Sequence, residues 1–417
     1  MKSVHDTRAR PVWLNGRAVA LLMAASLTTM ANATISPALP GLERLFADDP
    51  NAAMLTRLLV PAPSLSVALC APLAGLVIDR YGRRLPLLVG VILFVIAGCA
   101  GLFLPNLPAI FASRLVLGVA VALIMTAQTA LIGDYFAGGD RNALTGLQIS
   151  ARNFGGLVFI SLAGWIAAIS PRLPFAIYGL AAVFLPLMWR TIVDLPRRSP
   201  AFDANPAGGG EGQASWAIPM LLLVFLQAAT NMIFFVMPTQ MSFFLEARGF
   251  ESTAMTGAVL GVLMLAGGGL ALLYSRIQRT TGYAAIFFLG YAAMALGFVL
   301  LVFAATTPLL FAAAAAIGAG YALVSPSFVA LALNLTPLQY RGLSGGILTA
   351  SIFVGQFCSP LVSTPLIANH DYDGLFRGTA LLLAAMAISA GVPGGANWIR
   401  TRSTLRSKAI DDSWRAR

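Results

Sequence analysis

The sequence predicts an all-α polytopic membrane protein, with twelve transmembrane helices arranged as two six-helix pseudo-repeats. The 417 residues are 58% hydrophobic and only 10% charged, whereas soluble domains carry about 25% charged residues. Apolar stretches long enough to cross ~30 Å of hydrocarbon as helices recur along the whole chain. A stretch rich in Pro, Gly and Ser interrupts this series near its middle, so two blocks of similar length are expected.

Twelve apolar stretches are expected to span the membrane. They cover residues 17–39, 53–77, 85–104, 107–132, 143–168, 173–193, 216–243, 252–275, 283–303, 308–333, 343–368 and 374–398. The first has a basic flank and a small-residue site at Ala31-Asn32-Ala33, as a secretory signal would. Its apolar run continues past that site and further spans follow, so an uncleaved transmembrane helix is predicted.

Basic residues fall mainly in the loops and tails on one side of these spans, which predicts that both termini are cytoplasmic. The net charge of +11 is therefore a signal of topology and gives no reason to expect a nucleic-acid partner. We expect a multi-pass protein of the bacterial inner (plasma) membrane, in contact with the lipid bilayer.

Five segments follow from this pattern. They are a cytoplasmic N-terminal tail (1–16), an N-terminal six-helix bundle (17–193), a cytoplasmic linker (194–215), a C-terminal six-helix bundle (216–398) and a basic cytoplasmic tail (399–417). The loop Gly75–Arg83 has a weak counterpart in Ala271–Arg279, which indicates an internal repeat. Two parallel repeats with a binding site between them are typical of secondary transporters.

The loop between the second and third spans reads GLVIDRYGRR. Its glycines, carboxylate and arginines are Gly75, Asp79, Arg80, Gly82, Arg83 and Arg84. This spacing resembles the signature loop of the major facilitator superfamily. The resemblance implies a latch that joins the cytoplasmic ends of the two halves, with Asp79 facing Gly342–Ser344 and Arg80 or Arg83 paired with Asp134. The alternative is a basic loop that only fixes orientation.

Two arginines are predicted inside the spans. Arg114, about 10 Å deep, begins an Arg-x-x-x-Gly element that ends at Gly118 and resembles one tied to proton handling in proton-coupled members. Arg152 lies about 13 Å deep in SARNFGG, where drug/proton antiporters of the superfamily carry Gly-Pro-x-x-Gly-Gly. An arginine at such depth needs a partner or a wet cavity. Snorkelling of Arg114, or pairing of Arg152 with Asp140 or Asp134, are the alternatives.

None of the sixteen Asp and Glu residues is expected near the middle of a span. Organic-cation exporters usually need such a carboxylate, so unpaired Arg114 and Arg152 would favour an anionic or zwitterionic substrate. The other candidates for substrate binding or coupling are polar or aromatic residues inside spans, each of which has an interhelical hydrogen bond as its alternative role. They are Asn32, Gln128, Asn153, Asn231, Phe234, Gln240 and Gln356.

The stretches Thr34–Pro40 and Gly355–Pro360 resemble the drug-efflux branch, the twelve-helix drug/proton antiporters. That resemblance implies a secondary active transporter exporting a small amphiphilic solute, a drug or a secreted metabolite such as a metallophore, by proton antiport. The alternatives are organic-anion uptake or exchange on the same fold, and a polytopic membrane enzyme or scaffold. We expect a monomer that is no enzyme, with neither metal nor cofactor, since two His and three Cys form no ligand cluster.

Overall fold

The structure is a computed structural model that describes residues 15–136, 138–195, 214–250, 253–337 and 340–391. Most of the predicted tail 1–16, the centre of the predicted linker 194–215 and the predicted tail 399–417 lie outside the described residues. The end of the last predicted span, 392–398, lies outside them as well.

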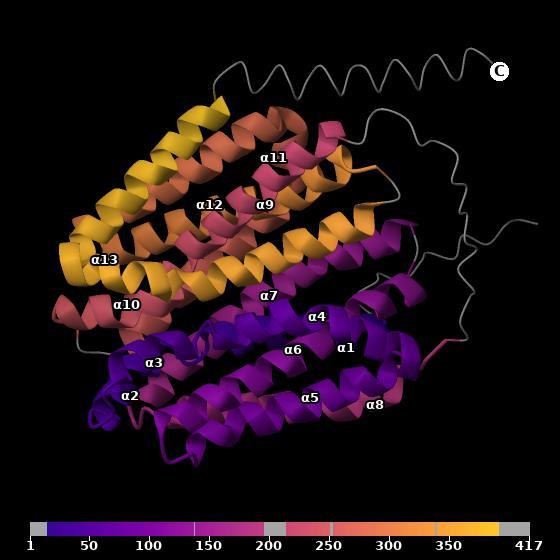
Figure 1. The fold of residues 1–417 in the computed structure, drawn as a ribbon, viewed down its shortest axis with the longest axis horizontal. Coiled ribbons are helices and arrows are strands. Elements are labelled where there is room, and N and C mark those ends of the chain that lie inside the picture. Colours follow the sequence, from indigo (N-terminus) through magenta and orange to yellow (C-terminus); the bar gives the residue numbers. More distant parts are fainter. Residues whose placement is uncertain (1–14, 137, 196–213, 251–252, 338–339, 392–417) are drawn as a thin grey trace, which may run out of the picture. The chain divides into compact units, whose positions relative to one another are not determined.

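Every regular element in the described part of the chain is a helix (Figure 1). In order they are α1 (Gly16–Ala33), η2 (Ser36–Ala38), α2 (Leu39–Leu45), α3 (Ala52–Leu59), α4 (Ala62–Tyr81), α5 (Arg84–Cys99), η3 (Ala100–Leu102), α6 (Leu107–Tyr135), α7 (Gly138–Ala167), η4 (Leu173–Phe184), α8 (Leu185–Thr191), α9 (Ala214–Phe234), α10 (Val236–Ala247), α11 (Thr253–Val302), α12 (Thr307–Leu335) and α13 (Arg341–Gly391). The prediction of an all-α protein is confirmed.

Ten helical segments among the described residues are long and apolar enough to cross a membrane. Two of them, α11 and α13, contain a non-helical residue, Gly282 and Asp371 respectively. Each break falls between two predicted spans, so the ten segments contain the twelve predicted apolar stretches (10 + 2). The chain is thus a multi-pass membrane protein.

Local sequence signals explain where several helices begin and end. The side chain of Asn15 accepts a hydrogen bond from the Arg17 amide at the start of α1, and Asn106 does the same for Ala109 at the start of α6. Helix α4 ends at Gly82, whose φ of 85° suits glycine and few other residues. These three residues mark helix boundaries that lie within a few residues of the predicted span ends.

The helices form two compact units. One comprises Met1–Gly261 with Leu335–Thr364, and the other comprises Val262–Asn334 with Pro365–Arg417. In the first, α1 packs on α6 and α7, and α6 packs on α4 and α5. The first unit therefore contains residues from both predicted halves, and all the site contacts described below lie inside it. The division of the chain at the predicted linker stays a prediction.

The internal repeat can be seen in the way helices touch through glycine. A methyl group placed on Gly118 would lie 2.2 Å from the carbonyl oxygen of Pro63, and one placed on Gly318 would lie 2.1 Å from that of Leu263. Both members of the second contact are 200 residues after those of the first. Such distances are shorter than any allowed contact, so α6 meets α4, and α12 meets the first part of α11, only because these positions lack a side chain.

A second pair of contacts has the same offset. Gly90 packs against Ala120, Leu123 and Ile124, while Gly290 packs against Gly320, Leu323 and Val324. Gly82 and Gly282 also share positive φ values, 85° and 78°. The two copies are therefore related by 200 residues, and the alignment of Gly75–Arg83 with Ala271–Arg279 was four residues out of register. In the corrected register Arg279 occupies the place of Asp79, so the second loop lacks the carboxylate.

Candidate functional site

The predicted gating loop closes α4 and opens α5. Arg83 Nε lies 3.1 Å from Asp134 Oδ2 at the end of α6, which is one of the two pairings that the sequence left open. Arg84 donates through Nη2 to the carbonyl oxygen of Trp189, 2.8 Å away, and its guanidinium covers the Trp189 ring at 4.8 Å. Both arginines are thus anchored to helices of the N-terminal sequence half.

The other charged residues of the loop are exposed. Arg80 lies over the ring of Tyr81, and Asp79 makes no hydrogen bond or ion pair with any described residue. A methyl group at Gly75 would meet nothing within 4 Å. The surroundings of Arg341 and Gly342 lie outside what the structure describes, so the expected approach of Asp79 to Gly342–Ser344 stays a prediction.

Arg114 is fully buried between helices. Its Nη2 donates to the carbonyl oxygens of Ala97 (3.0 Å) and Gly98 (2.8 Å), near the end of α5. The rings of Phe175 and Tyr178 in η4 lie 4.9 and 4.7 Å from the guanidinium carbon. Carbonyl oxygens and aromatic faces both stabilise a cation, so Arg114 has neutral partners within the N-terminal helices. Its Nε and Nη1 are buried without a hydrogen-bond partner.

Arg152 is half-buried in α7 and also has an interaction partner in the structure. The next residue, Asn153, donates to the carbonyl oxygen of Ile149 one turn earlier in the same helix, at 2.9 Å. The inference of an anionic substrate depended on two arginines without partners. Because Arg114 lies against carbonyl oxygens and aromatic rings and Arg152 has a partner, that support for an anion is weaker.

A small polar cluster joins helices from both sequence halves. Gln356 Oε1 in α13 accepts hydrogen bonds from Ser64 Oγ in α4, at 2.7 Å, and from Asn32 Nδ2 in α1, at 3.2 Å. Asn32 Oδ1 is buried and has no hydrogen-bond partner. The cluster therefore lies inside three predicted spans with an unused acceptor. The sequence pointed to Asn32 and Gln356, whereas Ser64 was missed because a hydroxyl in an apolar span is a weak signal.

Other predicted residues have partners nearby in the chain or on a neighbouring helix. Asn231 donates to the Gln227 carbonyl oxygen in its own helix, α9. Gln128 in α6 donates to the Leu21 carbonyl oxygen in α1 at 2.6 Å, and Phe234 is buried at the end of α9. Gln227, another polar residue of the same predicted span, is fully buried, and neither its Oε1 nor its Nε2 has a hydrogen-bond partner.

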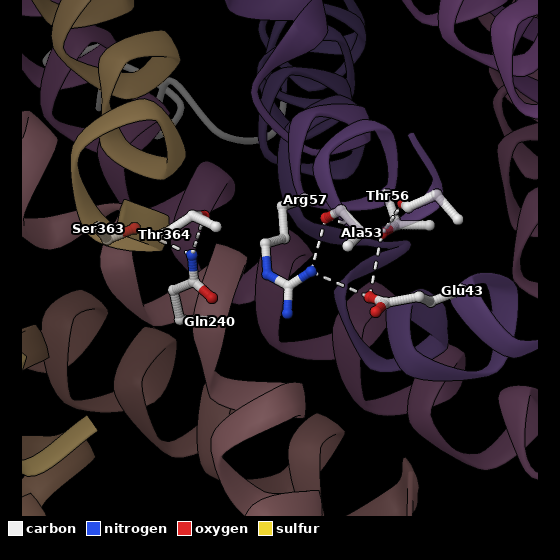
Figure 2. Close-up of polar contacts among 8 residues, drawn as sticks. Glu43, Ala53, Thr56, Arg57, Gln240, Ser363 and Thr364 are labelled. Atoms are coloured by element: carbon white, nitrogen blue, oxygen red, sulfur yellow. Dashed lines mark hydrogen bonds and ion pairs between the residues drawn. The ribbon is translucent and has the colours of Figure 1, made fainter. Parts of the chain in front are cut away.

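Gln240 ties α10 to α13. Its Nε2 donates to Ser363 Oγ at 2.9 Å and to Thr364 Oγ1 at 3.1 Å, as Figure 2 shows. Its Oε1 is buried without a partner. Gln240 therefore resembles Asn32, because the amide nitrogen of each residue donates a hydrogen bond while the amide oxygen has no partner.

Arg57 in α3 faces α10 at the end of the helices predicted to be extracellular. Its Nη1 donates to Glu43 Oε2 at 3.0 Å and to the Ala53 carbonyl oxygen at 2.6 Å (Figure 2), and its guanidinium carbon lies 4.1 Å from the centre of the Phe243 ring. An ion pair between Arg44 in α2 and Glu246 in α10 is the second link. Residues from the two sequence halves are therefore bridged at this end.

The polar side chains buried in the described spans are mostly neutral. The buried amide and hydroxyl atoms without a hydrogen-bond partner include Asn32 Oδ1, Gln227 Oε1 and Nε2, Gln240 Oε1, Ser242 Oγ and Ser359 Oγ. Arg114 Nε and Nη1 are buried without such a partner as well. Among the residues that the structure describes, no three His, Cys, Asp or Glu side chains come together as a metal site would require. The arrangement suits a ligand held by hydrogen bonds.

The sequence is similar to known resistance proteins. It is 28% identical to the class C tetracycline resistance protein of Escherichia coli over 414 residues, which cover 94% of this chain and 99% of that protein. It is 26% identical over 142 residues to the quinolone resistance protein NorA of Staphylococcus aureus, but that match spans only 37% of NorA and 34% of this chain.

Solved structures share the fold at low identity. A D-xylose-proton symporter matches with a TM-score of 0.71 at 19% identity, over 90% of this chain and 96% of the symporter. The human organic anion transporter MFSD10 matches with a TM-score of 0.69 at 18% identity, over 92% of this chain and all (100%) of the transporter. The family model described as Major Facilitator Superfamily matches residues 21–307, which is more than half of the chain. The chain therefore belongs to the Major Facilitator Superfamily, and it is a multi-pass membrane transporter with the fold of that family.

Proposed function

We propose that this transporter exports a small amphiphilic, zwitterionic solute by alternating access, in exchange for protons. The observation that carries the proposal is the cluster of Asn32, Ser64 and Gln356, which joins helices of both sequence halves through hydrogen bonds. Alternating access requires a site whose walls belong to both halves. The similarity to a tetracycline resistance protein over nearly the whole chain supports the direction of transport.

The preference for a zwitterion follows from what the site offers. Arg114 donates to two carbonyl oxygens and Arg152 has a partner, so neither residue points specifically to an anion. The unused groups of Asn32, Gln227, Gln240, Ser242 and Ser359 are neutral amides and hydroxyls, which can hydrogen-bond to both ends of a zwitterion without a matching charge. Tetracyclines and quinolones, the compounds named in the relatives' descriptions, both carry basic and acidic groups.

The remaining parts of the proposal rest on family resemblance and topology. Proton antiport fits the drug-efflux branch, although no carboxylate is predicted at the centre of a span. A monomer in the bacterial inner membrane, with both termini in the cytoplasm, fits the distribution of basic residues.

The test is transport into everted membrane vesicles from a bacterial host whose own drug exporters have been deleted. The probes are tetracycline and norfloxacin as zwitterions, ethidium as a lipophilic cation, and benzoate as an organic anion. Vesicles are energised by respiration, with and without a protonophore, and vesicles lacking the chain give the background. We expect energised uptake of a zwitterionic probe that the protonophore abolishes.

Matched variants test the site. Asn32→Ala and Gln356→Ala each remove a hydrogen-bonding group of the cluster and are expected to raise KM about fivefold, ~1 kcal/mol in binding. Asn369→Ala removes an exposed amide that donates to the Pro365 carbonyl oxygen in its own helix, and its KM should stay within about twofold of the wild type, which is under ~0.5 kcal/mol. If ethidium is the only probe taken up, the substrate class is a cation and the proposal of a zwitterion is overturned. If no probe shows energised uptake, the proposal of export is overturned.

A further inference from the structure

Asp194 lies just after α8 and reaches across to the gating loop. Its Oδ1 accepts hydrogen bonds from the backbone amides of Arg83 (2.8 Å) and Arg84 (3.0 Å). Its Oδ2 lies so close to Gly82 that a methyl group there would be 2.8 Å away. A residue 110 positions later in the chain thus contacts three consecutive residues of the loop.

The first amides of a helix have no partner inside that helix, and a side-chain oxygen usually satisfies them. Helix α5 has no such cap of its own, since Arg83 at the cap position makes no side-chain hydrogen bond to it. Asp194 supplies the missing acceptor, and its negative charge also suits the positive end of the helix dipole.

We propose that Asp194 is a positioning residue for the gating loop Gly75–Arg84. By holding the first turn of α5, it keeps Arg83 where its guanidinium pairs with Asp134, and the loop moves as one body with the N-terminal helices. This inference rests on the proposed transport function, because a gating loop has a role only in a protein that alternates between two states.

The segment that carries Asp194 is itself held in place. The hydroxyl of Tyr135, the last residue of α6, donates to the carbonyl oxygen of Val193 and accepts from the amide of Val193 at 2.8 Å. Arg17 of α1 lies over the Tyr135 ring, with its guanidinium carbon 4.7 Å from the ring centre. Asp194 is therefore presented to the loop by a fixed backbone.

The second copy of the repeat has no equivalent arrangement among the described residues. Gly282 shares the left-handed backbone of Gly82, yet a methyl group there would meet nothing within 4 Å. In the 200-residue register the position that corresponds to Asp194 is residue 394, a glycine, so the second copy has no carboxylate there.

The test compares Asp194→Ala with Asp194→Asn in the full-length protein. The asparagine keeps a side-chain oxygen at the same place and can accept both amide hydrogen bonds, whereas alanine can accept neither. Tetracycline or norfloxacin transport in everted vesicles gives Vmax and KM, whichever probe the wild type carries. Hydrogen–deuterium exchange of the purified protein in detergent reports the protection of residues 82–86.

For Asp194→Ala we expect Vmax to fall about tenfold, with KM within about twofold, as for loss of a capping interaction that substrate does not touch. Exchange at residues 82–86 should become faster. Asp194→Asn should restore both values to near those of the wild type. Tyr135→Phe removes the hydroxyl that holds Val193. It should lower Vmax and speed up exchange, as Asp194→Ala does, and it replaces Asp194→Ala in the test if that variant does not fold. Asp140→Ala is the matched control, because Asp140 is an exposed carboxylate with no bond to a described residue. It should change neither Vmax nor the exchange rate at residues 82–86.

Faster exchange with unchanged Vmax would overturn the gating role and leave a cap that only stabilises α5. An asparagine variant as impaired as alanine, with exchange at residues 82–86 as slow as in the wild type, would also overturn it, because the turn would then be held while transport was lost. Failure of the proposed function is distinguishable, since in that case the wild type transports no probe while the exchange data still report whether Asp194 is docked.

Discussion

Arg114 shows how a buried arginine can serve the fold. Two carbonyl oxygens and two aromatic rings surround the guanidinium, and the side chain has no exposed surface. The planar guanidinium can bond in its plane while its faces stack on rings, and a lysine ammonium cannot do both. The residue is therefore matched to its surroundings by shape as well as by charge.

We expect Arg114→Lys and Arg114→Gln to destabilise the protein by about 2–4 kcal/mol, because stacking and buried hydrogen bonds are lost together. The measurement is the thermal midpoint of the purified protein in detergent. Arg190→Lys, at an exposed position of α8, is the control and should leave the midpoint unchanged. Variants of Arg114 that bind a zwitterionic probe less tightly at unchanged stability would instead make Arg114 a ligand.

Gly82 and Gly282 form a matched pair of turns. Both adopt positive φ, which an alanine tolerates at a cost of about 1 kcal/mol. At Gly82 the added methyl group would also meet the Asp194 carboxylate at 2.8 Å, whereas at Gly282 it would meet nothing within 4 Å. We therefore expect Gly82→Ala to lower the thermal midpoint more than Gly282→Ala. Equal effects would mean that the carboxylate moves away freely.

At the scale of helices, the glycine contacts decide how closely the spans can pack. The α4–α6 contact at Gly118 and the α11–α12 contact at Gly318 leave no room for a single carbon atom. Close approach of helix backbones at small residues is a main source of helix association in membranes. An added methyl group must therefore separate the two helices or shift one of them.

Gly118→Ala and Gly318→Ala should each destabilise the protein by about 1–3 kcal/mol, the usual cost of overpacking. The control is Gly346→Ala, because Gly346 lies in helix α13 and a methyl group there would meet nothing within 4 Å. That control should be neutral or slightly stabilising, because alanine favours helix over glycine by ~1 kcal/mol. Thermal midpoints measured in one detergent compare all three, and a tolerated Gly118→Ala would contradict the packing described here.

At the scale of the whole molecule, the proposed alternating access would break and re-form the contacts between α10 and the α2–α3 region. The two links differ in burial. The side chains of Arg44 and Glu246 are 66% and 41% exposed, and such surface pairs contribute about 0–1 kcal/mol. Arg57 is only 15% exposed on its side chain, bonds to Glu43 and Ala53, and stacks on Phe243.

Arg57→Ala should therefore impair transport more than Arg44→Ala. We expect Vmax to fall about tenfold for the first, which loses a stacked and hydrogen-bonded cation. For the second, Vmax should stay within about twofold. Initial rates in everted vesicles provide the measurement, and quantified amounts of each variant in the membrane provide the control. A larger loss of Vmax for Arg44→Ala than for Arg57→Ala would mean that the exposed ion pair between Arg44 and Glu246 closes this end of the transporter.

Much of the fold could be predicted because membrane spans are a property of composition and length. The twelve apolar stretches appear in the structure, and the glycine and arginine spacing of residues 75–84 identified the family. The register of the repeat could not be read from the loop alone. Its charges diverged between the copies, and the matching glycines became visible only through the helices that they touch.

The candidate site was predicted less well, for a physical reason. The depth of Arg114 follows from its place in a span, but its partners lie on α5 and η4, and only the folded chain brings them together. Asp194 gave no signal either, because its role depends on amides at the start of a different helix. Amides such as Asn32 and Gln356 were easier to find, since a polar side chain in an apolar span always needs an explanation.

The constant offset of 200 residues between the glycine contacts is what a tandem duplication of one six-helix ancestor would leave. Two such ancestors, paired as a homodimer, would have placed an arginine or an alanine identically in both subunits. Fusion into one chain would allow the two copies to differ, and they do: Arg114 corresponds to Ala314, and Asp79 corresponds to Arg279. The shared glycines keep the same helix packing in both copies, whereas the mismatched charges are where the two halves differ.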